Sequence, residues 1–361
     1  MTQRPIMIRA GGTGGHVYPA LAVADELRSR GVPVVWLGTR KGIEARLVTQ
    51  AGFDMEWLSV SGLRGKGLLS LLLAPATLLL AGIQAFLIVV RRNPCVVLGM
   101  GGFVAGPGGL MAWLLRKPLL VHEQNAIPGL TNKILAKFAT VVLEAFPNSF
   151  PANFRGTVHV GNPVRRSIAT LAPPAQRMNE HDGALRLLIF GGSLGAAILN
   201  DVVPQALAGL PKDKRPLVWH QTGTKHIEQA TTKYAQLQIP ARIDAYIDDM
   251  AEAYAWADLV LCRAGAMSVT ELAAAGVASI LVPYPLAVDD HQTANARYLV
   301  DAGAAVLLPQ SMLGVEKLQG LLSDMTHAKV LDMANHARRL GMPESTRIVV
   351  EQCLSAGGIA C

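Results

Sequence analysis

Two glycine-rich turns, about half the chain apart, hold the residues best suited to bind a phosphate. The first is GGTGGH at 11–16, after the apolar run 6–10, and the second is GGSLGA at 191–196, after the apolar run 187–190. A strand that turns on glycines into a helix gathers bare backbone N–H groups at the positive end of that helix, which stabilises an anion. Two such turns in two halves of one chain predict twin nucleotide-type domains that face a cleft.

The first turn does not have the spacing of a redox dinucleotide site. Gly12 and Gly14 are followed by Val17 where the fingerprint requires a third glycine. The second predicted strand ends at Thr39-Arg40 and lacks the carboxylate that would hold an adenosine ribose. A hydride-transferring enzyme is therefore disfavoured. Either turn alone could simply be a tight turn that needs glycine, an explanation that the presence of two turns weakens.

Two titratable side chains stand where catalysis or recognition would need them. His16 opens the first predicted helix, whose positive end disfavours a protonated imidazole, so the neutral ring could act as a general base near pH 7. It could equally be a neutral histidine that only orients a phosphate or the backbone. Glu271 ends the glycine-led sequence RAGAMSVTE at 263–271 and could accept both hydroxyls of a ribose, or simply be stabilised by the helix dipole.

Side-chain amides add donor and acceptor pairs to this polar set. Asn125, Gln124 and Gln292 each follow a predicted strand or its loop. Sugar hydroxyls and an acetamido group require such paired donors and acceptors. Taken singly, each amide is as well explained by hydrogen bonding within its own loop.

The acidic pairs of the chain do not predict a metal site. Asp248-Asp249 and Asp289-Asp290 precede predicted helices and are expected to cap them, and the chain contains no Asp-X-Asp sequence. Helix ends and an arginine, Arg165 or Arg263, would then stabilise the charge of a leaving group in place of a required metal.

Composition limits the class of protein. The 361 residues suggest two domains, and with 51% hydrophobic and 16% charged residues each could bury its own core. A net charge of +7 favours anionic partners such as phosphates or an acidic membrane surface. Nucleic acid is the weakest option, because aromatic residues are only 5% of the chain and no basic run alternates with them. The four cysteines lack metal-ligand spacing, which predicts buried thiols and a reducing cytosol.

One apolar segment raises the question of a membrane. The 23 residues 68–90 carry no charge and lie between Arg64 and Lys66 on one side and Arg91 and Arg92 on the other. As a helix the segment would be about 34 Å long, enough to cross a ~30 Å hydrocarbon core. Proline inside it, basic residues at both ends and strands on either side argue against a span. We expect a membrane-surface element; a fully buried crossover helix and a true span are the alternatives.

Short apolar runs alternate with longer helical patterns, which is typical of parallel sheets built from βαβ units. A first predicted strand at 6–10 leaves no room for a signal peptide. A linker is expected from 166 to about 183, and a final helix over 344–354. The predicted strands are 6–10, 32–37, 55–60, 95–99, 119–122 and 141–145 in the first half, and 187–190, 217–221, 242–246, 259–262, 279–282 and 305–308 in the second.

Most of the unusual polar residues directly follow these strands. In open parallel sheets, ligands bind beyond the carboxyl ends of the strands. The coincidence predicts an active site at those ends. The residues concerned are His16, Gly101-Gly102, 122–125, Ser193, 221–223, 263–265 and 289–292.

An ordered set of sequence strings along the whole chain resembles the MurG family of bacterial N-acetylglucosaminyltransferases, in glycosyltransferase family 28. Each string alone is weak evidence, but the ordered set is specific. The strings are GGTGGHVYPALAVA at 11–24, SGLRGKG at 61–67, GMGGFVAGPGG at 99–109, HEQNAIPGLTNK at 122–133, GNPVR at 161–165, FGGSLGA at 190–196, HQTG at 220–223, YIDDMAEAYAWADLVLCRAGAMSVTELAAAG at 246–276 and VPYPLAVDDHQTANA at 282–296.

This resemblance implies a GT-B fold, an α/β architecture of two Rossmann-like parallel-sheet domains facing an interdomain cleft. The first domain would comprise 1–163 and a C-terminal helix, 344–361, that crosses back to it; the second, 164–343, would bind the donor. The implied reaction inverts the sugar: N-acetylglucosamine moves from UDP-N-acetylglucosamine to the 4-hydroxyl of the undecaprenyl-pyrophosphate-linked muramoyl-pentapeptide, lipid I, which yields lipid II.

The resemblance also implies roles for matching residues of this chain. His16 and Asn125 would be catalytic, with His16 as the base. The acceptor's pyrophosphate would lie on Gly11, Gly12, Gly101 and Gly102. The donor would contact Thr13, Gly14, Gly15, Asn125, Arg165, Ser193, Ile247, Ala266, Met267, Ser268, Val269, Thr270, Glu271 and Gln292.

The implied partners are UDP-N-acetylglucosamine, the undecaprenyl-linked acceptor, an anionic membrane surface and proteins of cell-wall synthesis, with no nucleic acid. No cofactor would be required, and a divalent cation would be non-essential. The protein would act peripherally at the cytoplasmic face of the bacterial inner membrane, in peptidoglycan synthesis and hence in cell shape and division.

Two other functions fit the same architecture, and two features depart from the family pattern. A UDP-N-acetylglucosamine 2-epimerase would need no lipid, and a non-catalytic membrane adaptor that binds nucleotide sugar would need only one half of the polar set. Arg9 stands at the end of the first predicted strand, where the family carries something apolar or small, so a buried charge there would need a partner. The segment 68–90 is also more apolar than the family pattern.

Overall fold

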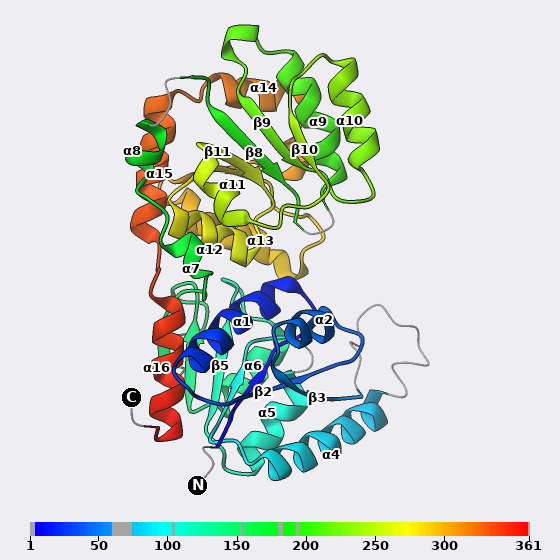
Figure 1. Ribbon diagram of the computed structural model, residues 1–361, viewed down its shortest axis with the longest axis vertical. Coiled ribbons are helices and arrows are strands. Elements are labelled where there is room, and N and C mark those ends of the chain that lie inside the picture. Colours follow the sequence, from blue (N-terminus) through cyan, green and yellow to red (C-terminus); the bar gives the residue numbers. More distant parts are fainter. Residues whose placement is uncertain are drawn as a thin grey trace. The chain divides into compact units, whose positions relative to one another are not determined.

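The computed structural model of the protein describes residues 4–59, 74–102, 105–151, 154, 156–179, 183–192 and 195–359 (Figure 1). The chain forms two compact units: unit 1 comprises Met1–Val164 and Glu344–Cys361, and unit 2 comprises Arg165–Pro343. Arg64, Lys66, the segment 68–73 and Ser193, all singled out by the sequence, lie outside the described residues.

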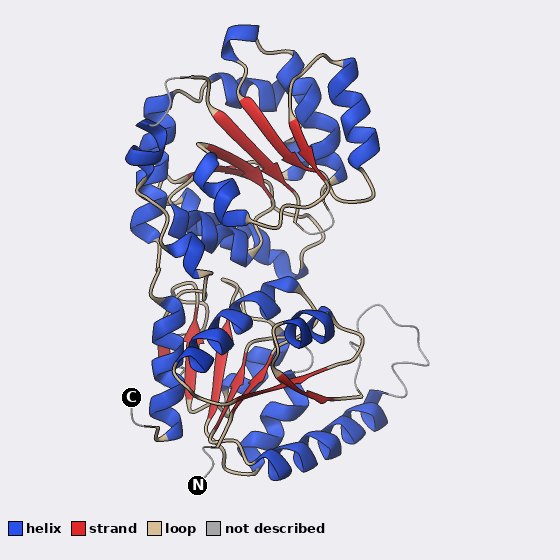
Figure 2. Ribbon diagram, in the orientation of Figure 1, coloured by secondary structure: helices blue, strands red, loops and turns tan. Residues whose placement is uncertain are grey.

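Unit 1 is built on a seven-stranded parallel sheet in the order β3-β2-β1-β4-β5-β6-β7 (Figure 2). Near-continuous apolar strands of this kind are covered on both faces. The strands are β1 (Ile6–Arg9), β2 (Val34–Gly38), β3 (Asp54–Trp57), β4 (Val96–Gly99), β5 (Leu119–Glu123), β6 (Val141–Glu144) and β7 (Thr157–His159).

Helices cover both faces of this sheet. Ile6 and Ile8 of β1 pack in one apolar cluster with α1 (Gly14–Ser29) and α16 (Ser345–Gly357). Met7, which points to the other face because strand side chains alternate, packs in a second cluster with α4 (Ala74–Arg92) and α5 (Ala105–Leu114). The remaining helices of the unit are α2 (Ile43–Gln50) and α6 (Leu130–Ala136).

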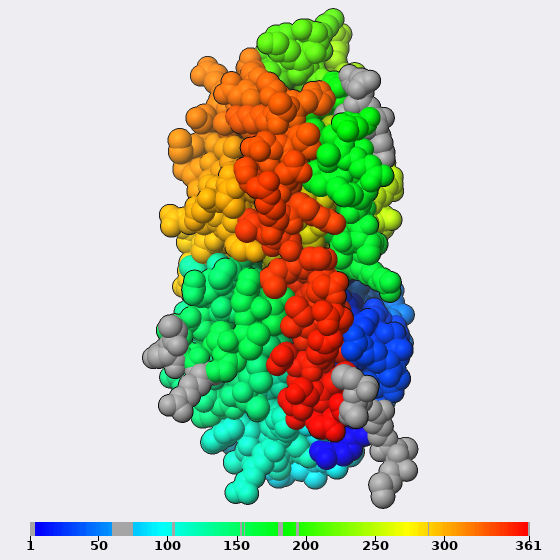
Figure 3. Space-filling view, turned by 90° about the vertical axis from the view of Figure 1, so that its left-hand side faces the viewer, coloured from blue at the N-terminus to red at the C-terminus, as the bar shows by residue number. Residues whose placement is uncertain are grey.

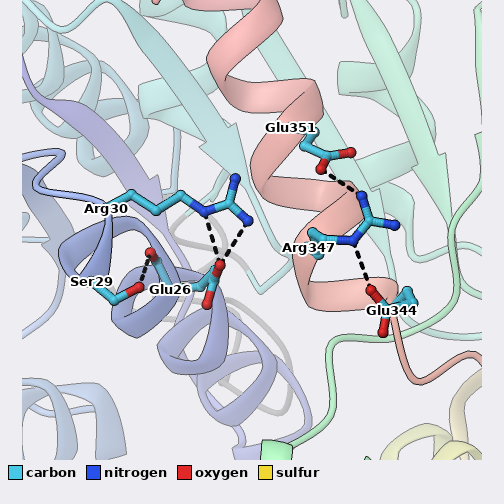
Figure 4. A network of polar contacts seen from close by, with 6 residues as sticks. All are labelled: Glu26, Ser29, Arg30, Glu344, Arg347 and Glu351. Carbon is cyan, nitrogen blue, oxygen red and sulfur yellow. Dashed lines mark hydrogen bonds and ion pairs between the residues drawn. The ribbon is translucent and has the colours of Figure 1, made fainter. Parts of the chain in front are cut away.

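The last helix of the chain belongs to unit 1. In Figure 3, α16 (red) lies at the surface beside the first residues of the chain (blue), and it contacts α1 and β4. Figure 4 shows ion pairs at the end of α1, between Glu26 and Arg30, and at the start of α16, between Arg347 and both Glu344 and Glu351. Exposed pairs of this type stabilise a helix by only about 0.3–0.5 kcal/mol. The buried apolar face of α16 therefore attaches it.

Unit 2 repeats the same architecture with a six-stranded parallel sheet in the order β10-β9-β8-β11-β12-β13. The strands are β8 (Arg186–Phe190), β9 (Leu217–Gln221), β10 (Arg242–Asp244), β11 (Leu259–Cys262), β12 (Ala278–Leu281) and β13 (Ala305–Leu307). The helices are α7 (Arg166–Ala169), α8 (Pro174–Asn179), α9 (Ala197–Ala208), α10 (Ile227–Gln236), α11 (Met250–Trp256), α12 (Ala266–Ala275), α13 (His291–Val300), α14 (Val315–Ser323) and α15 (His327–Leu340), with short 3-10 turns at Lys212–Lys214, Val288–Asp290 and Gln310–Met312.

The segment 166–183, expected as a linker, is instead partly helical. It contains α7 and α8, and Arg177 of α8 is buried. Its guanidinium donates to the carbonyl oxygens of Ala275 at 2.8 Å and Gly276 at 2.7 Å, which ends α12 against α8. The linker prediction was wrong because proline and polar composition hid a buried arginine that fastens this segment to unit 2.

The apolar segment after β3 forms helix α4, which buries one face against unit 1 and exposes the other. Ala81, Ala85 and Val89 face the sheet and are fully buried, so α4 is a crossover helix of unit 1. Leu79 and Leu87 on the other face are 66% and 60% exposed. The alternative of a fully buried helix is therefore wrong. By length and composition α4 is the one described helix that could cross a membrane, over Pro75–Arg92.

Arg9 is fully buried where β1 passes beneath α5. Its Nη1 donates to the carbonyl oxygen of Ala105 in the first turn of α5, but Nε and Nη2 have no hydrogen-bond partner among the described residues. Added Cβ atoms at Gly108 and Gly109 would lie 2.8–2.9 Å from the side chain, so these glycines make room for it. Burial lowers the pKa of the guanidinium to about 9, which still leaves it charged at pH 7. The partner that this buried charge was expected to need is thus one backbone carbonyl, that of Ala105.

We expect Arg9→Met to stabilise the protein. Methionine fills a similar apolar volume, and replacing a poorly paired buried charge by apolar atoms is often stabilising by about 1–4 kcal/mol. Thermal unfolding followed by circular dichroism measures the effect. Arg46→Met, at an exposed position of α2, is the matched control and should leave the melting temperature nearly unchanged. A lower melting temperature for Arg9→Met would show that the guanidinium stabilises the fold.

Candidate active site

The glycine turns of unit 1 touch each other at the carboxyl ends of adjacent strands. Gly11 and Gly12 follow β1, and Gly101-Gly102 follows β4, the neighbour of β1. A Cβ on Gly102 would lie 2.2 Å from the carbonyl oxygen of Gly11, and both Gly101 and Gly102 have positive φ. Only glycine allows this approach of two backbones. The residues expected to cradle a pyrophosphate therefore do lie side by side.

A buried carboxylate that the sequence did not reveal holds the first turn. Glu44 at the start of α2 is fully buried, and its Oε2 accepts from the N–H of Gly12 at 3.1 Å. Its Oε1 accepts from the backbone N–H and the hydroxyl of Thr39 at 3.1 and 2.7 Å. The amide of Gly12 is thus already bound to a carboxylate, so Gly12 shapes the turn and has no N–H left for an anion.

His16 lies in the first turn of α1, next to two residues of the HEQN sequence. Its Nδ1 is 3.0 Å from Oε1 of Gln124, and Nε2 of Gln124 is 3.1 Å from Nδ1 of His122. His122 is fully buried, and burial lowers its pKa to about 4, so its ring is neutral at pH 7. An added Cβ on Gly101 would lie 2.6 Å from Nδ1 of His16, so the histidine packs directly on the glycine turn after β4. The structure therefore places the candidate base beside the candidate anion site.

Asn125 is held by a second buried carboxylate. Oε1 of Glu123, at the end of β5, accepts from the backbone N–H of Asn125 at 2.9 Å and from its side-chain amide at 3.2 Å. The other oxygen accepts from the N–H of Gly129 at 3.1 Å and from Nδ2 of Asn132 at 2.9 Å. Glu123 therefore fixes both Asn125 and the start of α6. Its position two residues before Asn125 was the only sequence signal.

The second glycine turn follows β8 in unit 2 and packs on the loop after β9. A Cβ on Gly195 would lie 2.0 Å from the carbonyl oxygen of Thr222, and Gly192 and Gly195 have positive φ. Nδ2 of Asn200 in α9 donates to the same carbonyl at 3.0 Å. Two loops at adjacent strand ends are again locked together through backbone contacts. Ser193, the expected phosphate ligand of this turn, is not among the described residues.

The first turns of α12 follow β11 and begin after Gly265. Met267 and Ser268 are partly exposed, whereas Val269 is fully buried in unit 2. The hydroxyl of Thr270 donates within its own helix, to the carbonyl of Ala266 at 2.9 Å. Among the predicted residues Ala266–Thr270, Met267 and Ser268 are therefore the ones whose side chains reach the surface. They lie at the start of the helix, where its backbone N–H groups are.

Glu271 is enclosed by an arginine and a tyrosine. Oε1 accepts from Nη2 of Arg165 at 3.4 Å, and Oε2 accepts from the hydroxyl of Tyr254 at 3.1 Å. Burial raises the pKa of Glu271, and the charge of Arg165 and the two hydrogen bonds oppose that rise. Arg165 precedes α7 and Tyr254 lies in α11, so three elements meet at this carboxylate. The sequence predicted Glu271 and Arg165 but missed Tyr254.

The remaining predicted residues of unit 2 have local partners. Ile247 is buried in the loop after β10. Oε1 of Gln292 accepts from the N–H of Tyr284 at 2.8 Å, which ties α13 to the loop after β12. Arg263 donates to the carbonyls of Val282 and Pro283, both at 3.2 Å, and so braces that loop instead of presenting its charge to a ligand.

The two acidic pairs differ in role. Asp249 caps α11 as predicted, accepting from the N–H groups of Ala251 and Glu252. Asp290 does not accept from backbone N–H groups of α13; its carboxylate accepts from the hydroxyl of Thr293 at 2.7 Å, so this capping prediction was wrong. Asp289 and Asp290 both have positive φ, and that backbone turns Asp290 away from the helix amides. Over the described ranges, no three His, Cys, Asp or Glu side chains form a metal-like group.

Comparison with known proteins relates both halves of the chain to one family. The glycosyltransferase family 28 N-terminal domain matches residues 6–144 and the family 28 C-terminal domain matches residues 186–345. A relative from Nitrosococcus oceani, 54% identical over 97% of this chain and 98% of its own, is named UDP-N-acetylglucosamine–N-acetylmuramyl-(pentapeptide) pyrophosphoryl-undecaprenol N-acetylglucosamine transferase. A relative from Nitrosomonas europaea, 54% identical over 98% of this chain and 99% of its own, has the same name.

Solved structures agree with this relation. The crystal structure of MurG from Acinetobacter baumannii has a TM-score of 0.85 and 41% identity, and covers 98% of this chain and 99% of that one. A UDP-N-acetylglucosamine 2-epimerase has a TM-score of 0.66 and covers 99% of this chain and 97% of its own. At 14% identity the epimerase shows a shared fold alone.

We expect Glu123→Gln to lower the free energy of unfolding by about 2–3 kcal/mol, because a neutral amide loses charge-assisted bonds and places an N–H group against other donors. The midpoint of urea unfolding measures the loss. Glu344→Gln, which alters an exposed partner of Arg347, is the control and should change stability by less than about 0.5 kcal/mol. Equal midpoints for both variants would contradict the role assigned to Glu123.

Proposed function

The chain belongs to glycosyltransferase family 28, and from this premise we propose how its residues carry out the family's reaction. The chain is an N-acetylglucosaminyltransferase that moves N-acetylglucosamine from UDP-N-acetylglucosamine to the muramoyl-pentapeptide of undecaprenyl-pyrophosphate-linked lipid I. The product is lipid II, a precursor of peptidoglycan. The chain has the two parallel-sheet α/β domains of the GT-B fold, as the resemblance predicted.

The observation that carries the proposed donor site is the enclosed carboxylate of Glu271. A ribose presents two adjacent hydroxyl donors, and a carboxylate that is only 12% exposed and is fixed by Tyr254 and Arg165 offers acceptors at a set position. The start of α12 lies a few residues before Glu271 and supplies N–H groups and a positive helix end for a diphosphate. Unit 2 thus presents what a nucleoside diphosphate needs. Ser193 and Gln292 would add contacts to phosphate and sugar.

In unit 1 the adjacent glycine turns and His16 support an acceptor site. The backbone of Gly101-Gly102 and of Gly11 would border the acceptor's pyrophosphate, and Gly12 would contribute shape alone, since Glu44 occupies its amide. Thr13, Gly14 and Gly15 begin α1 and would meet the donor from this unit. Asn125, held by Glu123, would orient the donor sugar.

The proposed chemistry is a single displacement. His16 takes the proton of the acceptor's 4-hydroxyl, and that oxygen attacks the anomeric carbon from the face opposite UDP. The bond between the anomeric carbon and the UDP oxygen breaks, and its electron pair leaves with UDP. Helix N-termini and the guanidinium of Arg165 stabilise the charge that develops on the leaving group. We propose that these groups do so without a required metal ion.

No observation favours the two alternative functions. The relatives that are more than half identical over nearly the whole chain are named as transferases, whereas the epimerase likeness extends to the fold alone. A nucleotide-sugar adaptor would not need the base, amide and carboxylate arrangement that unit 1 retains.

Labelled transfer tests this proposal directly. Purified protein is incubated with UDP-[14C]N-acetylglucosamine and lipid I, with magnesium or with EDTA, and label is followed into the lipid fraction. We expect acceptor-dependent transfer that EDTA lowers by less than about twofold. His16→Gln should lower kcat by about 10²–10⁴-fold, the usual contribution of a general base. Loss of transfer with EDTA would refute the metal-free mechanism, and formation of N-acetylmannosamine would support the epimerase.

We further propose that unit 1 binds the cytoplasmic face of the inner membrane through an apolar patch. The patch consists of the exposed apolar side chains of α4, α5 and α6 that line a groove of about 850 Å³, including Leu78, Leu79, Ile83, Phe86, Leu110, Leu130 and Ile134. An exposed apolar surface of this kind is typical of a membrane contact. The lipid-linked acceptor of the relatives makes such a contact useful, because it brings the enzyme to its substrate.

The basic residues around the apolar patch differ in how much positive charge they present to a membrane surface. Arg91 and Arg92, the basic residues that follow the apolar segment, form ion pairs with Glu56 of β3. Lys133 of α6 and Lys137, which directly follows that helix, are exposed. Burial of apolar side chains therefore supplies most of the proposed attachment, and screening by salt should weaken it only in part.

We expect the double variant Leu79→Glu/Leu130→Glu, at two exposed leucines of the apolar patch, to bind vesicles of phosphatidylglycerol and phosphatidylethanolamine at least tenfold more weakly. Each leucine would otherwise contribute about 1.5–3 kcal/mol of apolar burial. Co-sedimentation measures binding, and Leu217→Glu, at a 56% exposed position of β9, is the matched control. Transfer to an acceptor with a short, water-soluble lipid should persist. Unchanged vesicle binding, or resistance of the wild type to extraction from membranes by alkaline carbonate, would contradict peripheral attachment through this patch.

A further inference from the structure

A chain of hydrogen-bonding groups leads from the backbone of unit 1 to His16. It begins at the carbonyl oxygen of Gly161, which is 3.0 Å from Nε2 of His122. Nδ1 of His122 is 3.1 Å from Nε2 of Gln124, and Oε1 of Gln124 is 3.0 Å from Nδ1 of His16. Nε2 of Gln124 also donates to the carbonyl oxygen of Met100 at 3.0 Å. His122 and Gln124 are both buried, so water does not compete for these bonds.

The direction of every bond in this chain follows from its two backbone carbonyls. A carbonyl oxygen only accepts, so Nε2 of His122 carries a proton and donates it to Gly161. The neutral ring of His122 has a single N–H, so its Nδ1 is an acceptor. The atom of Gln124 that faces it must then be the amide nitrogen, which the bond to Met100 also requires. The amide oxygen of Gln124 therefore faces His16 and can only accept.

We propose that Gln124, supported by His122, is a positioning residue that holds His16 in the tautomer with the proton on Nδ1. Nε2 of His16 then carries the lone pair, and this nitrogen is the one that accepts the proton of the acceptor's hydroxyl. The inference rests on the proposed role of His16 as the base. When Nε2 is protonated, the ring becomes a cation, and its bond from Nδ1 to the amide oxygen of Gln124 becomes charge-assisted and stronger.

The packing of Gly101 supports this arrangement independently. A Cβ at this position would lie 2.6 Å from Nδ1 of His16 and 3.1 Å from Oε1 of Gln124, so it would intrude on the bond that joins them. The positive φ of Gly101, 87°, also disfavours any residue with a side chain. The glycine after β4 thus makes room for the hydrogen bond to the base, in addition to any contact with an anion.

Long-range proton–nitrogen NMR on protein labelled with ¹⁵N at histidine reads the tautomer of each neutral ring directly. The signals of His16 are assigned by their absence in His16→Gln. We expect the wild type to carry the proton on Nδ1 of His16. In Gln124→Met, which removes the acceptor at similar volume, we expect the proton to shift in large part to Nε2. A wild-type His16 with its proton on Nε2 would overturn the proposal, whatever the activity of the enzyme.

Kinetics then separates positioning from binding. Gln124→Met should lower kcat by about 10–100-fold and leave the KM for UDP-N-acetylglucosamine within about twofold. His122→Leu should have a smaller effect, because the bond to Met100 still orients the amide of Gln124. Gln319→Met is the matched control: it removes an amide that donates to a backbone carbonyl, that of Gly209 at 2.8 Å, in unit 2. Its kcat should equal that of the wild type.

The outcomes distinguish this inference from the proposed function. If the wild type transfers no sugar, the proposed function fails, while the NMR result still decides the tautomer. If His16→Gln is fully active, His16 is not the base and the positioning role is overturned. A fall in kcat for Gln124→Met with an unchanged tautomer of His16 would also overturn it, since the loss would then be structural.

Discussion

The contact of backbone with backbone at adjacent strand ends is the constraint on which the polar cluster of each unit depends. In unit 1 the glycine turn after β4 touches the turn after β1, and in unit 2 the turn after β8 touches the loop after β9. The Cβ distances of 2.2 Å at Gly102 and 2.0 Å at Gly195 leave no space for any side chain. Close approach of the turns brings helix N-termini and polar side chains from different strands into one place. Glycine is thus required there for the packing of backbone on backbone.

Buried acidic side chains then fix the loops that glycine allows. Glu44 binds the turn after β1, Glu123 binds the loop after β5, and Glu144 accepts from the N–H groups of Asn148 and Phe150 after β6. Each carboxylate satisfies backbone donors that would otherwise be buried without a partner, a loss of about 1–3 kcal/mol per group. In this way loops at strand ends become rigid enough to position His16 and Asn125.

Much of this arrangement could be predicted from the sequence, because it depends on local pattern. The predicted strands agree with twelve of the observed ones to within about three residues at each end, since strands buried on both faces appear as continuous apolar runs. Thr157–His159, strand β7, is too short and too polar to show this pattern. The glycine turns, His16 and Glu271 were found because chemistry and helix starts constrain residue type at a fixed spacing.

The partners of those residues could not be predicted, because they come from distant parts of the chain. Tyr254 meets Glu271 from α11 and Arg165 from the residue before α7, and Glu44 reaches Gly12 across 32 residues. Nothing in a single sequence indicates such long-range pairs. The same limit explains why α8 was taken for a linker: the carbonyls that Arg177 binds lie almost 100 residues further on.

The two unusual features of this chain, Arg9 and the very apolar α4, lie on the same face of the unit 1 sheet. Arg9 passes beneath α5, and α5 packs against α4. A poorly paired guanidinium inside an apolar layer costs several kcal/mol, and glycine within α5 costs about 0.5–1 kcal/mol more per residue. Despite these costs α5 stays packed on the sheet, because its apolar residues are buried together with those of α4 and the strands. The exposed side of α4 adds nothing to that packing. Its apolar character therefore has no structural cause within unit 1, and the lipid contact that we propose would supply one.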